Sequence, residues 1–264
     1  MSALLEVCDL NKHFGGLHAV RNVSFTVERG EVVGILGPNG AGKTTLYNLL
    51  TGFIAPDAGA RVVFEGRMLI GLAPHRIAGL GISRTFQLCR PFVGMSVLEN
   101  VIVGALGSKR GDREDLDTRA HTLLQRVGLA GKERVPVEVL SYGDQRRLEI
   151  ARALAAKPLL LLLDEPFAGL GSGEIADLSA LIRQVHADEG LTVLLIEHKL
   201  REFMRLVGRV IALDFGEVIA QGTPEDIVRH PAVIEAYIGR GNADAEVDAE
   251  AHAEADPAEP VHAA

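Results

Sequence analysis

Residues 37–45 read Gly-Pro-Asn-Gly-Ala-Gly-Lys-Thr-Thr, and this stretch decides the fold of the 264-residue chain. An apolar run at residues 32–36 precedes it, and a helical pattern at residues 46–50 follows it. Strand, glycine-rich loop and helix, in that order, are the context in which the pattern G-x-x-x-x-G-K-S/T binds phosphate. Because glycines let successive N–H groups turn inward and the helix adds its positive dipole end, the stretch predicts an anion site in an α/β fold. The alternative is a glycine-rich turn that carries a surface lysine.

The residue types in this loop suit the parts of a nucleoside triphosphate. Lys43 is expected to reach the terminal phosphates, and the Thr44 hydroxyl is expected to hold magnesium. The other residues assigned to the phosphate site are Gly37, Pro38, Asn39, Gly40, Ala41, Gly42 and Thr45.

Composition and length indicate a globular protein that does not span a membrane. The chain is 47% apolar and long enough for one large core, or for one core with an inserted subdomain. Its longest strongly apolar run, residues 159–163, is far short of the roughly 20 residues that a membrane-spanning helix needs. No basic and apolar leader opens the sequence, and Cys8 and Cys89 lack metal-ligand spacing, so we expect a reduced, cytosolic protein.

The net charge of −8 is concentrated at the C-terminal end of the chain. Residues 241–264 contain seven acidic residues and neither lysine nor arginine, so the rest of the chain is almost neutral. A neutral body argues against non-specific nucleic-acid binding, which depends on a basic surface. Because residues 241–264 also lack apolar periodicity, they are predicted to form an acidic, disordered tail after a domain of residues 1–240.

The N-terminal part of the sequence predicts antiparallel strands. Residues 4–7 are apolar, and Val23, Phe25 and Val27 alternate with polar residues, as in half-buried strands. Residues 11–16 lie between these segments and are expected to form a loop. The one aromatic residue of that loop, Phe14, is either a core anchor or a stacking surface for a flat ligand ring.

A helical insertion is predicted in the middle of the chain. Residues 82–87 are expected to form a strand that ends in the amide of Gln87, a group that is either solvated or faces the phosphate site. Residues from about 88 to 157 contain no good strand pattern, and Ser96 and Glu99 have the spacing of a capping box.

The last helix of this insertion, starting near Ser141, carries a second candidate anion site. Ser141 can cap the helix, and the N–H groups from Gly143 onward point out of its first turn. By itself, this pattern indicates only a charged, capped helix.

Two buried strands are predicted to end in polar side chains. Residues 159–163 are continuously apolar, as in a parallel strand covered on both faces, and they lead into Asp164 and Glu165. Open α/β sheets bind their ligands at the carboxyl ends of such strands. Asp164 is therefore a candidate to hold magnesium and Glu165 to orient or deprotonate a water, with a solvated strand end as the alternative. Residues 191–196 form a similar run that ends beside His198, which is either a structural histidine or part of the same site.

These motifs, in this order, resemble the ATP-binding subunits of ABC transporters. The resemblance covers about residues 4–239 and implies a P-loop ATPase core with an N-terminal antiparallel β subdomain and an inserted helical subdomain. The signature stretch after Leu140 is its specific part, because phosphate loops occur in many unrelated hydrolases. Finer features are similar to the subunits of branched-chain amino acid importers, and they lie at residues 13–17, 84–87, 141–143, 168–170 and 234–239.

The resemblance implies roles that the residue pattern leaves open. Phe14 matches an aromatic residue that stacks on adenine. Gln87 matches a glutamine that contacts magnesium and the attacking water and senses the membrane partner. Glu165 matches the general base, and His198 the histidine at the γ-phosphate. The residues assigned to the ATP of an opposite subunit are Ser141, Tyr142, Gly143, Asp144 and Gln145.

The function implied is ATP hydrolysis, with ATP and Mg²⁺ as cofactors, to power an importer, above all for branched-chain amino acids. The implied partners are transmembrane permease subunits, a second ATP-binding subunit (an identical or a different chain) and, indirectly, a solute-binding protein, but no nucleic acid. The expected location is the cytoplasm, on the inner face of the cell membrane. The alternatives are a transporter for urea, another amide or a lipid, and a soluble ABC ATPase that acts as a nucleotide-gated binding module. Such soluble proteins usually carry two cassettes or a long coiled-coil insertion, and this sequence shows neither.

Three positions depart from the commonest pattern of the family. Tyr142 replaces the first glycine of the signature, Gly171 stands where many members have Asp or Asn, and Lys199 follows His198 where an acidic residue is common. None of them removes a residue that hydrolysis requires, so an active ATPase is predicted.

Overall fold

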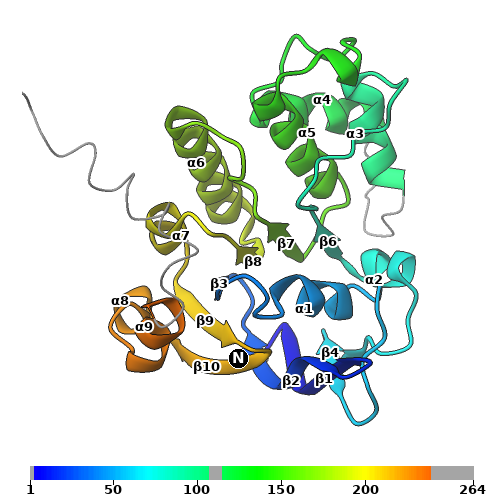
Figure 1. Ribbon diagram of the computed structural model, residues 1–264. Coiled ribbons are helices and arrows are strands. Elements are labelled where there is room, and N and C mark those ends of the chain that lie inside the picture. Colours follow the sequence, from blue (N-terminus) through cyan, green and yellow to red (C-terminus); the bar gives the residue numbers. More distant parts are fainter. Residues whose placement is uncertain (1–2, 107–114, 239–264) are drawn as a thin grey trace, which may run out of the picture.

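The computed structural model describes residues 3–106 and 115–238, and a six-stranded sheet forms the centre of the molecule (Figure 1). The strand order is β10-β9-β3-β8-β7-β6, with all neighbours parallel except β10, which is antiparallel to β9. The strands are β3 (Val32–Leu36), β6 (Ile82–Arg84), β7 (Leu160–Asp164), β8 (Thr192–Ile196), β9 (Arg209–Asp214) and β10 (Glu217–Gly222). Strands β7 and β8 are buried along their whole length, which agrees with their continuous apolar runs.

A second sheet is antiparallel and has the order β2-β1-β4-β5. Its strands are β1 (Leu5–Phe14), β2 (Leu17–Val27), β4 (Arg61–Phe64) and β5 (Arg67–Met68). Helix α1 (Lys43–Leu50) contributes Leu46, Tyr47 and Leu50 to the core that this sheet shares with the central sheet.

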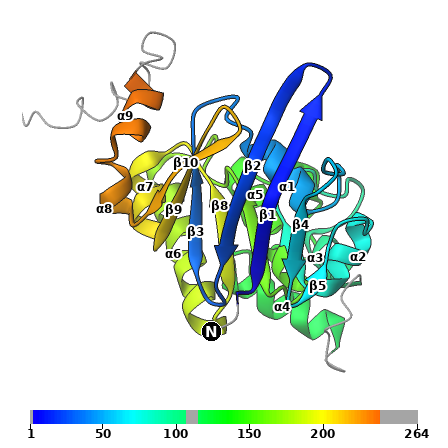
Figure 2. The same cartoon turned by 90° about the horizontal axis from the view of Figure 1, so that it is seen from below.

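The prediction of a loop at residues 11–16 is wrong. Strand β1 continues through Phe14, and only Gly15 and Gly16 separate it from β2. Figure 2 shows this hairpin extending beyond the ends of the neighbouring strands. Because this outer part of the hairpin has no core to face, the apolar alternation that would have predicted a strand is missing there.

Side chains of the central sheet alternate between two cores. Leu160, Leu162 and Leu194 face α1 and the antiparallel sheet, whereas Leu161 and Leu163 face the helices on the other side.

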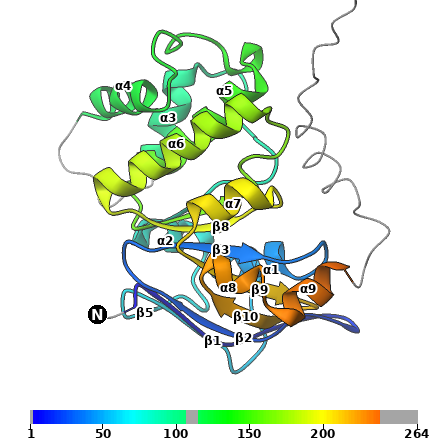
Figure 3. The same ribbon diagram turned by 90° about the vertical axis from the view of Figure 1, so that its left-hand side faces the viewer.

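The remaining helices are α2 (Pro74–Leu80), α3 (Val97–Leu106), α4 (Leu116–Arg126), a short 3₁₀ helix (Val137–Val139), α5 (Tyr142–Ala155), α6 (Ser172–Glu189), α7 (Leu200–Leu206), α8 (Pro224–Ile227) and α9 (Pro231–Ile238). Figure 3 shows α3, α4, α5 and α6 together on the side of the central sheet opposite β1 and β2.

The predicted insertion corresponds to helices α3, α4 and α5, which pack against one another. The capping box at the start of α3 is present: the Ser96 N–H donates to Glu99 Oε2 at 2.7 Å, and the Glu99 N–H donates to Ser96 Oγ at 3.2 Å. The strand predicted at residues 82–87 is shorter than expected. It ends at Arg84, because the Phe86 N–H turns away to Glu149 Oε1 of α5, at 2.8 Å.

The parallel register brings three loops to one edge of the central sheet. Ile196 pairs with Ile35 on one side and with Asp164 on the other, so the segments that follow β3, β7 and β8 leave the sheet together. None of the helices within residues 3–106 and 115–238 is long and apolar enough to cross a membrane. The predicted tail, residues 241–264, lies outside the described residues.

Candidate functional site

The phosphate loop runs from the end of β3 to the start of α1 and folds around Lys43. The Lys43 ammonium donates to the carbonyl oxygens of Gly37 and Pro38, at 2.5 and 3.0 Å. Gly40 and Gly42 have φ of 82° and 97°, in the left-handed region that favours glycine. A Cβ at Gly42 would also lie 2.5 Å from a backbone oxygen of β2, so the close approach of loop and strand requires glycine.

The Lys43 side chain is buried in this loop. Burial lowers its pKa to about 8, against the opposing effect of the Glu165 and Asp164 carboxylates. Its two hydrogen bonds go to backbone carbonyls, which a bound phosphate could replace with oxygens of full negative charge.

A cavity of about 370 Å³ lies beside the loop and joins it to the ends of β7 and β8. The predicted site residues that line it are Asn39, Gly40, Ala41, Gly42, Lys43, Thr44, Thr45, Gln87, Glu165 and His198. Gly37 and Pro38 contribute through the carbonyls that hold Lys43. Phe14, Asp164 and the signature residues of α5 do not line it.

Glu165 stands between two of the other predicted site residues. Its Oε2 accepts a hydrogen bond from Gln87 Nε2 at 2.9 Å, and its Oε1 lies 2.9 Å from His198 Nε2. The hydrogen bond with His198 is the main cause of the lowered pKa of Glu165, and Gln87 and Lys43 add to it. Glu165 has a φ of 50°, so the chain turns sharply here and directs the side chain at the cavity. The arrangement provides an ionised carboxylate in the wall of the cavity.

Asp164 does not line this cavity but a neighbouring pocket, which Thr44 and Gln87 also line. It is 1% exposed, and its Oδ2 accepts a hydrogen bond from Arg84 at 2.8 Å. Its Oδ1 is buried and has no hydrogen-bond partner among the described residues. Burial raises the pKa of this carboxyl, against the effect of Arg84. A buried carboxylate oxygen without a partner suits a hard cation, and the nearby Thr44 hydroxyl and Gln87 amide are oxygen donors of the same kind.

Leu17, His18 and Phe215 line the cavity, whereas Phe14 does not. Phe14 is 45% exposed near the tip of the β1–β2 hairpin, with the Lys12 ammonium 5.5 Å from its ring centroid. The adenine role of Phe14 therefore stays a prediction. Phe215, in the turn between β9 and β10, had no signal in the sequence that set it apart from an ordinary turn residue.

Two alanine variants separate these aromatic side chains. If Phe14 stacks on adenine, Phe14→Ala should weaken ATP binding by the worth of one stacked base, about 1–3 kcal/mol, and Phe215→Ala by much less. Calorimetric titration of both variants with ATP measures the difference. A large loss in Phe215→Ala alone would move the base contact to the β9–β10 turn.

The signature residues form the first turn of α5. The Ser141 hydroxyl accepts a hydrogen bond from the Asp144 N–H at 3.2 Å, as predicted for a cap. A Cβ at Gly143 would lie 2.2 Å from the Glu174 carboxylate, so any other residue there would require the Glu174 side chain to move. Gln145 donates to the Leu140 carbonyl at 3.3 Å, and Asp144 pairs with Lys132.

The signature helix is also tied to Gln87 within the same chain, through Arg146. This side chain is 2% exposed and donates to the carbonyls of Phe86 and Gln87, at 3.1 and 2.6 Å. It also donates to the Tyr142 hydroxyl at 2.7 Å. Tyr142, a departure from the common signature, therefore has a structural partner, and any shift of α5 would act on the main chain of Gln87.

The other two departures lie close together. The Lys199 ammonium donates to the carbonyl of Leu170 at 3.2 Å, next to Gly171, and the Gly171 N–H donates to Glu174 at 3.0 Å. The loop that contains Gly171 is thus held by Lys199 on one side and by α6 on the other.

Glu197 is a site residue that the sequence analysis did not identify. It is 2% exposed, and its carboxylate accepts the N–H groups of Phe167, His198 and Lys199 at 2.8, 2.7 and 2.9 Å. It therefore fastens the loop after Glu165 to the loop that carries His198. Burial raises the pKa of this carboxyl, and the three N–H groups oppose that rise.

Glu197→Gln should destabilise the protein, because an amide NH₂ would face N–H donors and leave buried groups unpaired. We expect a loss of about 1–3 kcal/mol in the free energy of unfolding, measured by urea denaturation. Glu202→Gln, on the neighbouring helix α7, is the matched control and should unfold as the unmodified chain does. Equal stability of Glu197→Gln and the control would show that the three hydrogen bonds to Glu197 contribute little to the stability of the fold.

The chain is similar to known proteins over most of its length. The family model of the ABC transporter matches residues 20–168, and that of the branched-chain amino acid ATP-binding cassette transporter matches residues 217–243. The high-affinity branched-chain amino acid transport ATP-binding protein LivG of Salmonella typhimurium is 43% identical over 251 residues, covering 89% of this chain and 98% of LivG. The corresponding protein BraF of Pseudomonas aeruginosa is 41% identical over the same shares of the two chains.

Two solved structures have the same fold. An ATP-binding cassette of an ABC transporter in its ADP conformation matches with a TM-score of 0.82 and 32% identity, over 90% of this chain and all of that chain. A dimeric ATP-binding cassette bound to ADP and phosphate matches with a TM-score of 0.75 and 26% identity, over 83% of this chain and 98% of that chain.

The fold consists of a P-loop α/β core, an antiparallel subdomain and a helical insertion. Together with these matches, it defines an ATP-binding cassette ATPase, and the predicted fold class is confirmed. The chain belongs to the ABC transporter family and is one of its ATP-binding, ATP-hydrolysing subunits. Within the family it is similar to LivG and BraF.

Proposed function

We propose that this subunit powers the import of branched-chain amino acids. The observation that carries the proposal is the similarity to LivG over nearly the whole of both chains, with the match of residues 217–243 to the branched-chain amino acid cassettes as independent support. Residues 1–240 would form the complete cassette, with residues 88–157 as its helical subdomain and residues 241–264 as an appended tail.

The phosphates of ATP would lie in the cavity beside the phosphate loop. Lys43 would exchange its two carbonyl partners for phosphate oxygens, and the loop N–H groups would bind the remaining charge. Thr44, Gln87 and Asp164 would hold Mg²⁺, and the strongest reason for including Asp164 is that its Oδ1 has no hydrogen-bond partner within residues 3–106 and 115–238. The ion would neutralise negative charge on the phosphates during transfer.

Hydrolysis would use the carboxylate of Glu165 as the base that accepts a proton from the attacking water. Gln87 would orient that water together with Glu165, since the two side chains are already hydrogen-bonded. His198, which also contacts Glu165, would lie at the γ-phosphate. Glu197 would keep the loops of Glu165 and His198 at a fixed separation.

The site of one chain is only part of the proposed catalytic centre. Because Ser141–Gln145 do not line the cavity of their own chain, they would complete the site of a second subunit. A dimeric cassette with bound ADP and phosphate among the structural neighbours supports this arrangement. Two ATP molecules would then lie between two subunits, and their hydrolysis would open the pair.

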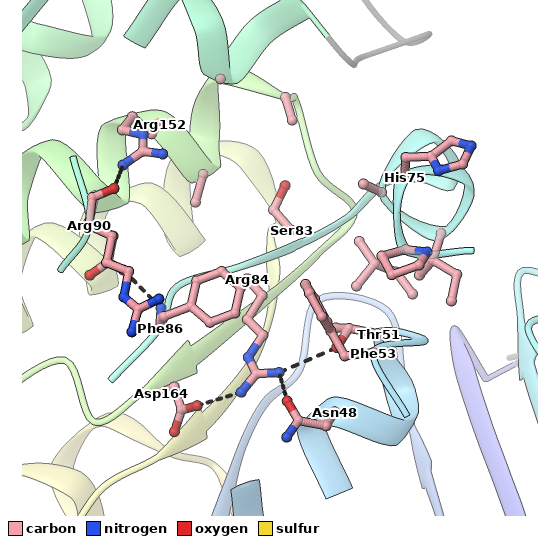
Figure 4. Close-up of a pocket in the computed structure, with 18 of the residues that line it drawn as sticks. Asn48, Thr51, Phe53, His75, Ser83, Arg84, Phe86, Arg90, Arg152 and Asp164 are labelled. Carbon is pink, nitrogen blue, oxygen red and sulfur yellow. Dashed lines mark hydrogen bonds and ion pairs between the residues drawn. The ribbon is translucent and has the colours of Figure 1, made fainter. Parts of the chain in front are cut away.

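A groove between the central sheet and the helical insertion is the proposed docking surface for the permease. It has a volume of about 810 Å³, and its lining includes the exposed side chains of Leu88 and Phe92. The exposed rings of Phe53 and Phe86 also line it (Figure 4). Gln87 lines both the groove and the ATP cavity, so a permease segment in the groove would sense the state of the nucleotide. The subunit would therefore work on the cytoplasmic face of the membrane, with a solute-binding protein as an indirect partner.

The second candidate function keeps the ATPase and changes the cargo. A transporter for urea, another amide or a lipid would use the same ATP site, because this subunit does not contact the cargo. The proteins that copurify with the tagged full-length chain from solubilised membranes distinguish a transporter subunit, for any of these cargoes, from a soluble ABC ATPase. We expect two membrane permease subunits and a second ATP-binding subunit; recovery of ribosomal proteins or DNA-binding proteins without a permease would contradict transport.

A further inference from the structure

Arg84 joins the docking groove to the proposed magnesium ligand Asp164. It ends strand β6 on the floor of the groove, and its side chain is 6% exposed. Figure 4 shows the guanidinium directed at Asp164 on one side and at helix α1 on the other. Its Nη2 donates to Asp164 Oδ2 at 2.8 Å, and its Nη1 donates to Asn48 Oδ1 and Thr51 Oγ1 at 2.7 and 3.3 Å.

Aromatic rings fix the plane of the same guanidinium. Its central carbon lies 5.4 Å from the centroid of the Tyr47 ring and 4.9 Å from that of Phe86. Phe86 in turn meets Phe53 edge to face in the wall of the groove, with ring centroids 5.8 Å apart. The position of Arg84 is therefore set by two side chains of α1, by Thr51 after it and by the aromatic wall of the groove.

The two oxygens of Asp164 are in different states. Oδ2 is occupied by Arg84, whereas Oδ1 is buried without a partner among the described residues. The backbone N–H of Asp164 donates to the buried Thr85 hydroxyl at 3.1 Å, so the main chain here is fixed as well. Arg84 Nη2 holds Oδ2, while Nη1 of the same planar guanidinium is held by Asn48 and Thr51, so the orientation of the carboxylate is restrained and Oδ1 remains the oxygen available to a cation.

We propose that Arg84 is a positioning residue: it holds Asp164 in the orientation that Mg²⁺ requires, from the floor of the groove where the permease would dock. This inference rests on the proposed role of Asp164 in holding Mg²⁺. It adds a physical link between the groove and the nucleotide site that does not pass through Gln87.

A purely electrostatic role for Arg84 predicts an effect of the opposite sign. If the guanidinium acted only as a nearby positive charge, it would repel Mg²⁺, and removing it would strengthen the binding of the ion. If it positions the carboxylate, removing it lets Asp164 rotate, and Mg²⁺ binding weakens.

The test compares binding of a non-hydrolysable ATP analogue, adenylyl imidodiphosphate, to the full-length chain in saturating Mg²⁺ and in EDTA. The ratio of the two affinities reports how strongly the protein uses the ion. In Arg84→Met we expect this ratio to fall by about 10–100-fold, the usual effect of losing an outer-shell partner of a metal ligand. Arg84→Lys should give a smaller fall, because an ammonium keeps the charge but cannot bind Asp164, Asn48 and Thr51 in one plane. Affinity in EDTA should be unchanged in both.

Arg90→Met is the matched control. Arg90 is exposed in the same groove, and no hydrogen bond to Asp164 is formed by its side chain, so its removal should leave the ratio unchanged. An unchanged or increased ratio in Arg84→Met would overturn the proposal. If that variant does not fold, as circular dichroism would reveal, a ratio in Arg84→Lys equal to that of the unmodified chain overturns it instead. A lack of Mg²⁺ dependence in the unmodified chain would contradict the proposed function itself.

Discussion

Replacing Glu165 with glutamine is expected to slow ATP hydrolysis by ~10²–10⁴-fold, the usual contribution of a general base. The substitution keeps the size of the side chain but removes its capacity to accept a proton. Nucleotide affinity should change little, because the phosphates are bound by the loop of residues 37–45 and by Lys43. Steady-state phosphate release and calorimetric ATP binding measure the two quantities separately.

The same variant should accumulate as an ATP-bound dimer. If hydrolysis separates the two subunits, a chain that binds ATP without hydrolysing it stays in the closed pair, which light scattering after gel filtration would detect. Glu225→Gln, at an exposed position on α8, is the control and should hydrolyse ATP normally. Near-normal turnover in Glu165→Gln would remove Glu165 from its role as the base.

Replacing Lys43 with alanine is expected to have the largest effect on nucleotide binding. The loss of one partner of a buried charge pair costs about 2–5 kcal/mol, which is a fall in ATP affinity of roughly 30- to 4,000-fold. Burial lowers the pKa of Lys43 to about 8, and a bound phosphate would offset the cost of burying its charge.

Lys157→Met provides the control for the loss of a lysine, since Lys157 precedes β7 at the opposite edge of the sheet. It should bind ATP as the unmodified chain does. Thermal melting of Lys43→Ala without nucleotide should show a folded protein, because Lys43 holds only two carbonyls of its own loop in that state. Normal ATP affinity in Lys43→Ala would place the triphosphate elsewhere.

The fold could be predicted from sequence wherever one physical constraint dominates. Strands β7 and β8 are apolar on both faces because both faces are covered, and the glycine loop before α1 allows successive N–H groups to turn toward a phosphate at the helix end. The outer half of the β1–β2 hairpin was mistaken for a loop because it lies beyond the core, where no apolar pattern is required.

The site could be predicted only as far as topology determines it. Parallel strands place their carboxyl ends together, so Glu165 and His198 were expected near the phosphate loop. The partners of Arg84, Arg146 and Glu197 could not be predicted, because each depends on register or on backbone groups that leave no mark in the sequence. Arg84 reaches Asp164 because β6 pairs in parallel with β7, and Arg146 and Glu197 bind main-chain atoms.

The most direct test reconstitutes this subunit with its copurified permease and solute-binding protein in liposomes and measures ATP hydrolysis as solutes are added. We predict that leucine, isoleucine or valine stimulates hydrolysis and accumulates inside the vesicles, and that Glu165→Gln abolishes both effects. Hydrolysis that is indifferent to these amino acids but stimulated by a different solute, such as urea, would contradict the assignment.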